Sequence, residues 1–304
     1  MPELSGWEAA GLVSRLTFYL ALIFTVGGTY AQWLIADSSR RFRQRNLLYT
    51  LLGTVLGFHA VAVYFLVQVG GVNQSGMSGM FDWSLISFYL QLPVGDATVL
   101  RLSGFLLLLA GQLAALVHIS RLDRPPRHRF DNTLVIYNTA GLALVIFSLR
   151  MTGHMATQPL ASQLGLILHV SAMSLWLGAL FPLWMMTREF GSESLHTGLL
   201  RFSRIAVVIV AILIAAGGVM VWQLFASLDQ VFTSPYGRAL LIKLLLVLLL
   251  LSLAGLNKWY LSPKVLQSGG AVKLRRSIGG EMLAGLLILV VTAWLSTVTG
   301  PGEH

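Results

Sequence analysis

The chain has 304 residues, of which 56% are apolar and only 11% are charged. Soluble domains carry about 25% charged residues, so this composition excludes a soluble globular protein and predicts a polytopic membrane protein. The net charge of +9 is compatible with a nucleic-acid partner, but the basic residues lie between apolar runs. They are better explained as topology signals, and we expect no nucleic acid. Cysteine is absent, which excludes disulfides, cysteine-based zinc sites and thiolate nucleophiles.

The hydropathy pattern predicts eight membrane-spanning helices, each bounded by charge, glycine or proline. The spans are expected at residues 12–36, 46–69, 98–119, 132–152, 162–187, 204–227, 238–260 and 276–298. The segment 82–93 is apolar but too short to cross, so we expect an interfacial helix with Trp83 and Tyr89 at headgroup level. The predicted fold is all-α, with residues 1–304 forming a single membrane domain in a lipid bilayer.

The distribution of basic residues orients the bundle. The linkers 37–46, 120–131, 188–204 and 257–276 hold 16 of the 21 lysines and arginines. The opposite side of the membrane keeps Arg15, Arg101, Arg150, Arg238 and Lys243. Cytoplasmic loops carry the excess of lysine and arginine, so the four basic linkers are predicted inside and both termini in the periplasm.

Three histidines fall in the outer half of the bundle in this orientation. His154 lies just past the outer end of the fourth span. His169 lies roughly 10 Å into the fifth span, and His59 lies roughly 15 Å into the second. Ionisable groups within a membrane by default face a cavity or the bundle interior. A single histidine within a membrane is more often a hydrogen-bond partner between helices than a ligand.

Methionines accompany two of these histidines. Met151 and Met155 flank His154, and Met173 follows His169 by four residues and shares its helix face. Imidazole and thioether groups suit Cu(I), because this soft ion favours sulfur and nitrogen over oxygen donors. We therefore predict a copper site drawn from these residues and His59. Packing in an apolar chain is the alternative explanation of each methionine.

Other residues are candidates for a translocation path. Trp176 lies two helical turns beyond His169 on the same face. Glu281 lies on the cytoplasmic side of the last span, where either an ion pair with Arg275 or Lys258 or a role in the exit path explains it.

The outer loop and one glycine complete the candidates. Met77 and Met80 lie in the loop 70–97, where they either capture copper from outside or belong to a flexible segment. Gly178 is expected to allow close approach between helices.

Five segments carry motifs in a fixed order. They are TGHM at 152–155, HVSAMSLWLGALFPL at 169–183, RFSRIAVV at 201–208, TSPYGRALLIKLLLVLLLLSLAGLNKWYLSP at 233–263 and LRRSIGGEMLAGLLIL at 274–289. Together they resemble the CopD family of bacterial inner-membrane copper resistance proteins. The CopD-like region is expected over residues 132–304, which contain five of the predicted spans, after three N-terminal spans in residues 1–131.

The resemblance implies a protein of the bacterial inner membrane that handles copper. It also implies copper delivery by a small periplasmic partner of the CopC type. Some relatives carry that partner fused, and since this sequence holds no such segment we expect a separate donor. By motif position, His154 and His169 take the place of the family's histidines. The predicted function is movement of copper from the periplasm to the cytoplasm through the outer His/Met site.

Two other functions are compatible with the same residues. His59 and His169 on facing helices can ligate haem b in an electron-transfer protein. A copper chaperone or assembly factor that does not transport needs the same outer site. Enzymatic activity is not expected, because the sequence shows no Ser/His/Asp or paired-carboxylate pattern, and the phosphate-binding motif GxxxxGK[ST] is also absent.

Overall fold

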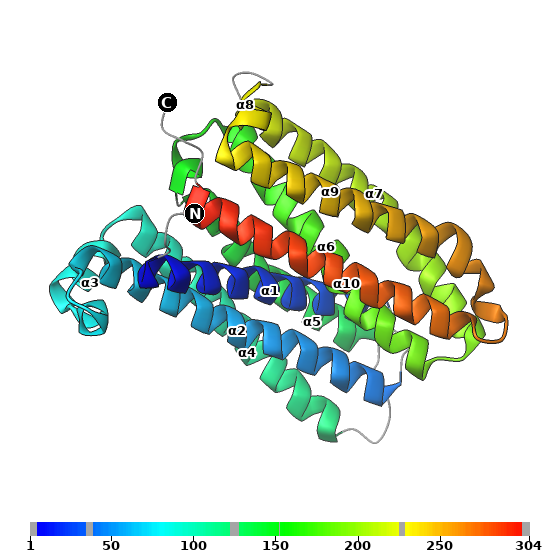
Figure 1. The fold of residues 1–304 in the computed structure, drawn as a ribbon. Coiled ribbons are helices and arrows are strands. Elements are labelled where there is room, and N and C mark those ends of the chain that lie inside the picture. Colours follow the sequence, from blue (N-terminus) through cyan, green and yellow to red (C-terminus); the bar gives the residue numbers. More distant parts are fainter. Residues whose placement is uncertain (1–4, 35–38, 122–127, 152, 225–228, 300–304) are drawn as a thin grey trace.

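The structure, a computed structural model, describes residues 5–34, 39–121, 128–151, 153–224 and 229–299. Within these residues eight helices are long and apolar enough to cross a membrane, as predicted. They belong to α1 (Gly6–Leu34), α2 (Arg40–Asn73), α4 (Pro93–Arg121), α5 (His128–Phe147), α6 (Leu160–Glu189), α7 (Ser192–Leu224), α9 (Pro235–Leu256) and α10 (Gly270–Trp294) (Figure 1). The described residues contain no strand, so the all-α polytopic fold is confirmed.

Short helical segments connect the spans. The 3-10 turn η1 (Met77–Phe81) and the short helix α3 (Trp83–Leu90) join α2 to α4, where the interfacial helix was expected. The 3-10 turns η2 (Ser148–Met151) and η3 (Gly153–Thr157) lead from α5 to α6, and α8 (Asp229–Thr233) precedes α9. The π-helical turn η4 (Asn257–Leu261) and the 3-10 turn η5 (Pro263–Leu266) join α9 to α10, which continues into the π-helical turn η6 (Leu295–Thr299).

Several helices extend beyond the apolar runs that predicted them. Helix α2 begins at Arg40, before the expected start at residue 46. The preceding Ser39 caps it, since the Phe42 amide donates a 3.2 Å hydrogen bond to the Ser39 hydroxyl oxygen. Arg41 and Arg45 in this first part of the helix are exposed, because their long side chains reach polar surroundings. Hydropathy therefore marks the apolar centre of each helix rather than its ends.

Helices α1 and α6 hold the bundle together. Helix α1 packs against α2, α5, α6 and α10 and lies across the middle of the molecule (Figure 1). One buried apolar cluster is built mainly from α1, α6, α7, α9 and α10, and a second from α1, α2, α4, α5 and α6. Helices α7 and α9 are the least buried spans, so they offer most of their surface to lipid.

The basic linkers gather at one end of the bundle. Arg40 donates a 2.7 Å hydrogen bond to the Ser120 carbonyl, which ties the start of α2 to the end of α4. Arg45 forms an ion pair with Glu189 at the end of α6. The start of α1 and the end of α10 meet at the opposite end (Figure 1). This arrangement agrees with an even number of spans, while the side that faces the periplasm stays a prediction.

Two glycines mark the crossing of α1 and α6. A Cβ atom added to Gly27 or to Gly178 would overlap the backbone of the other helix. The Tyr49 hydroxyl on α2 donates a 3.2 Å hydrogen bond to the Gly178 carbonyl at the same crossing. The close helix approach predicted for Gly178 is confirmed.

Candidate functional site

His169 lies in the half of α6 that begins at Leu160, and its ring points toward α7. Its Nδ1 atom is 3.2 Å from the carbonyl oxygen of Leu213. Gly217 on α7 leaves room for the ring, since a Cβ there would lie 3.1 Å from His169 Cε1. A carbonyl oxygen can only accept a hydrogen bond, so Nδ1 carries the proton and Nε2 of the neutral ring keeps its lone pair. This is the usual arrangement of a metal-binding histidine, whose second nitrogen is oriented by a backbone carbonyl.

Two side chains influence what His169 can bind. Met173 is half-buried and packs against both apolar clusters. Lys243 on α9 lies close enough for its charge to act on His169. An ammonium group at this position would repel a second cation beside His169.

The predicted partner of His169 cannot be placed in the same way. The side chains of His154 and Met155 lie outside the described residues, although the backbone turn η3 that carries them packs against α6. Met151 in η2 is half-buried. Among the described residues, no group of three or more histidine and acidic side chains has a metal-binding arrangement. The copper site at His154 and His169 therefore stays a prediction.

His59 has different surroundings from His169. It is exposed on α2, and its Nδ1 atom lies 2.8 Å from the Val55 carbonyl oxygen of its own helix. The ring of His169 turns instead toward α7. The two histidines thus face different neighbours, and the haem alternative gains no support from them.

The two methionines of the predicted outer loop differ in their exposure. Met77 is 80% exposed. Met80 packs against α2, since a Cβ on Gly70 would lie 2.7 Å from its Cγ atom. Of this pair, Met77 is the one free to meet a ligand from outside the membrane.

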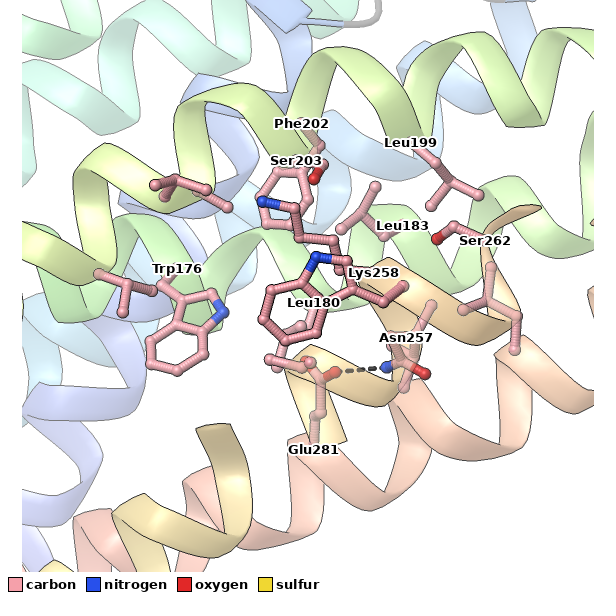
Figure 2. A pocket seen from close by; sticks show the side chains of 18 of the residues that line it. Trp176, Leu180, Leu183, Leu199, Phe202, Ser203, Asn257, Lys258, Ser262 and Glu281 are labelled. Atoms are coloured by element: carbon pink, nitrogen blue, oxygen red, sulfur yellow. Dashed lines mark hydrogen bonds between the residues drawn. The ribbon is translucent and has the colours of Figure 1, made fainter. Parts of the chain in front are cut away.

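A cavity of about 330 Å³ lies between α6, α7, α9 and α10 (Figure 2). Its lining residues belong to the half of the bundle nearer the basic linkers. Most of its lining is apolar or aromatic. Its lining side chains with polar groups are Trp176, Ser203, Asn257, Lys258, Trp259, Ser262 and Glu281. The candidate path residue Trp176 is the lining residue closest along α6 to His169, so the cavity begins about two turns from that histidine.

The polar centre of this cavity is a buried pair. Glu281 on α10 is only 3% exposed. Its carboxyl oxygen accepts a hydrogen bond from the side-chain amide of Asn257 (Figure 2). Neither Arg275 nor Lys258 forms an ion pair with Glu281, although all these residues are described. The ion pair that was one predicted explanation of Glu281 is therefore not present in the structure.

The π-helical turn η4 positions Asn257. The amide of Ser262 donates a 2.8 Å hydrogen bond to the Asn257 carbonyl across this widened turn. Such π-turns occur often at functional sites because they rotate a side chain out of the regular helical order. Sequence reasoning placed Asn257 within a CopD-like motif but did not select it as a site residue.

Comparisons with known proteins identify the family. The profile described as "CopD: Copper resistance protein D" matches residues 198–295, which contain most of α7 together with α9, η4 and α10. Copper resistance protein D of Pseudomonas syringae pv. tomato is 29% identical over 241 residues, covering 73% of this chain and 76% of that protein. Over residues 198–295 the chain is similar to the CopD family. It is thus a copper-related membrane protein.

A second relative is longer. Copper transport protein CutJ of Bacillus subtilis (strain 168) is 24% identical over 301 residues, covering 95% of this chain and 52% of that protein. The chain thus spans about half the length of the Bacillus protein. No solved structure matches the chain.

The CopD match includes only part of the candidate residues. Residues 198–295 contain Asn257 and Glu281, whereas His154 and His169 precede them. The family match thus covers the α7, α9 and α10 walls of the cavity but not the α6 wall with Trp176.

Proposed function

We propose that this CopD protein moves copper from the periplasm to the cytoplasm through a His/Met site in the outer half of its helix bundle. The observation that carries the proposal is the CopD match, together with relatives named for copper resistance and copper transport. In the predicted orientation, with the basic linkers in the cytoplasm, His169 lies on the periplasmic side.

The proposed ligands are His154 and His169, assisted by Met151, Met155 and Met173. The Nε2 lone pair of His169 supports this role, because its Nδ1 is turned to the Leu213 carbonyl. Nitrogen and sulfur donors without thiolate favour Cu(I) and hold it more weakly than cysteine would. His59 is a secondary candidate, since its exposed ring requires a ligand partner outside the α6–α7 contact.

The membrane potential supplies a driving force for inward movement. It contributes about 2.3 kcal/mol per elementary charge per 100 mV for a cation that enters the cytoplasm. The sequence contains no phosphate-binding motif through which nucleotide hydrolysis would act. Inward flow of a cation down this potential requires no nucleotide hydrolysis.

We further propose that the protein resides in the bacterial inner membrane and receives copper from a separate CopC-like protein in the periplasm. The exposed Met77 in the outer loop is the proposed first contact for the incoming ion, because a thioether is a soft donor.

Replacement of His154 and His169 by alanine in one variant tests the site. We expect copper-dependent accumulation in cells to fall to the level of cells that lack the protein, because both imidazole ligands are lost. The matched control is His118→Ala, an exposed histidine at the other end of the bundle, which should leave accumulation unchanged. Wild-type accumulation in the double variant would remove the site assignment.

Reconstitution of the purified protein into vesicles separates transport from the other functions. Cu(I) that enters the vesicles supports transport, whereas Cu(I) that binds without entering favours a copper chaperone. A Soret absorption band in the purified protein would instead favour the haem-binding alternative.

A further inference from the structure

His169 and the cavity lie at different levels of the same contact between α6 and α7. His169 faces the Leu213 carbonyl of α7. Trp176, seven residues further along α6, lines the cavity together with Val210 of α7. The rise of an α-helix places these two levels about 10 Å apart. The cavity then continues toward Glu281 and the end of the bundle that holds the basic linkers.

The charges around Glu281 are few. Glu281 and Lys258 are the titratable side chains that line the cavity, while α6, α7 and α9 contribute apolar or aromatic groups and the hydroxyl of Ser203. The Lys258 ammonium lies 5.7 Å from the centre of the Trp259 ring and forms no ion pair with Glu281. A buried carboxylate whose hydrogen-bond partner is a neutral amide is strongly destabilised. Burial of Glu281 therefore favours the protonated carboxyl group while no cation is present.

A cation that enters this cavity is also destabilised by its surroundings. In apolar surroundings within a membrane, a cation is destabilised unless it meets an anion. Glu281 is the one acidic side chain of the cavity lining. Ionisation of Glu281 and entry of a cation therefore favour each other.

We propose that the cavity is an inner transit site for copper, in which the Glu281 carboxyl exchanges its proton for the metal ion. As Cu(I) enters, the carboxyl O–H bond breaks, the proton leaves toward the cytoplasm and the carboxylate neutralises the ion. As Cu(I) leaves, a proton returns to the same carboxylate. Each step exchanges one positive charge for another, and copper keeps its oxidation state. This inference rests on the proposed function and adds an inner site to the same path.

Asn257 acts as a positioning residue in this exchange. Its amide nitrogen holds the Glu281 carboxyl group, and its Oδ1 atom is buried without a hydrogen-bond partner among the described residues. That oxygen offers a second donor beside the carboxylate, and the Trp176 ring on the α6 side of the cavity attracts cations through its π-face. Oxygen donors hold Cu(I) weakly, which suits an ion that is about to be released.

Infrared difference spectroscopy on the purified full-length protein tests the proton exchange directly. We expect a carbonyl band of a protonated carboxyl group in the wild type, absent from Glu281→Gln, and lost when Cu(I) is added. The matched control is Glu193→Gln, an exposed acidic residue at the start of α7, which should keep the band and its response to Cu(I). A band that persists with saturating Cu(I), or that is unchanged in Glu281→Gln, overturns the proposal.

Cu(I) flux into vesicles provides the second test. Lower pH at the cytoplasmic face should slow wild-type flux, because protons and Cu(I) compete for the same carboxylate. Glu281→Gln should slow flux roughly 100-fold and remove the pH dependence, since a unit charge is lost beside the ion in a medium of low dielectric constant. Glu281→Asp keeps the carboxyl group and should retain the pH dependence.

The outcomes separate this inference from the transport proposal. Wild-type flux and pH dependence in Glu281→Gln would overturn the inner site and leave transport standing. A wild-type protein that moves no copper but loses its carboxyl band with Cu(I) would reject transport and support the cavity as a copper-binding site.

Discussion

At the scale of single residues, the small size of glycine makes two contacts between helices possible. Gly217 lets the His169 ring reach the Leu213 carbonyl, and Gly27 with Gly178 lets the backbones of α1 and α6 touch. All three glycines lie within helices, so what they provide is space rather than an unusual backbone conformation. Small residues at such crossings are typical of helix packing in membranes.

Gly178→Ala is expected to destabilise the protein. Its methyl group would overlap the backbone of α1, and overpacking of this kind costs about 1–3 kcal/mol. The control is Gly165→Ala on the same helix, where the nearest atom to an added Cβ is Met220 Cγ at 3.9 Å. That variant should be neutral or more stable by up to about 1 kcal/mol, because alanine favours helix. Thermal unfolding in detergent measures both, and equal melting temperatures would contradict the packing argument.

At the scale of elements, local hydrogen bonds shape the loop between α2 and α4. Asp82 caps α3, since one carboxylate oxygen accepts hydrogen bonds from the Ser84 amide at 2.9 Å, the Ser84 hydroxyl at 2.7 Å and the Leu85 amide at 3.2 Å. The hydrogen bond from the Ser84 hydroxyl, followed by that from the Leu85 amide, lowers the pKa of Asp82 below its usual value. The cap is therefore an ionised carboxylate at neutral pH.

The start of α3 is expected to loosen in acid. Because the pKa of Asp82 is lower in the folded loop, its stabilising effect is present above the pKa of the unfolded chain and is lost as pH falls through the folded value. Hydrogen exchange at the Ser84 and Leu85 amides measures this.

Two variants isolate the charge of the cap. Asp82→Ala should speed exchange of both amides at all pH values, whereas Asp82→Asn should keep a neutral cap and remove the pH dependence. A wild-type pH profile in Asp82→Asn would show that another group is responsible.

At the scale of the whole molecule, the distribution of charge predicts the orientation of the bundle in the membrane. The arginine-rich start of α2 and the ends of α4 and α6 lie at one end, tied by the Arg40–Ser120 hydrogen bond and the Arg45–Glu189 ion pair. The loop with η1 and α3 lies at the other end (Figure 1). The positive-inside bias predicts that the first end is cytoplasmic.

The absence of native cysteine makes this orientation easy to test. Single cysteines at exposed Ser75 in the outer loop and at exposed Ser192 between α6 and α7 should behave oppositely. A membrane-impermeant maleimide should label Ser75→Cys in intact spheroplasts and should label Ser192→Cys only after lysis. The reverse pattern would invert the predicted topology and move His169 to the cytoplasmic side.

Family, helix number and helix type followed from sequence alone. Backbone groups in lipid must be satisfied within each helix, so the length of an apolar run predicts a span without knowledge of its neighbours. The motif order predicted the CopD family, which the comparisons confirmed. Gly178 was also predictable, because a small residue within an apolar helix indicates close packing.

Tertiary structure decided which polar groups meet. His169 and Leu213 are 44 residues apart in the chain, and Asn257 and Glu281 are 24 apart. Hydrophobic periodicity carries little information on how a lipid-facing helix is rotated, because both lipid and bundle interior are apolar. The sequence thus identified Glu281 as an energetically unfavourable residue within a membrane span. Its amide partner and the cavity beside it depend on how α6, α7, α9 and α10 pack together.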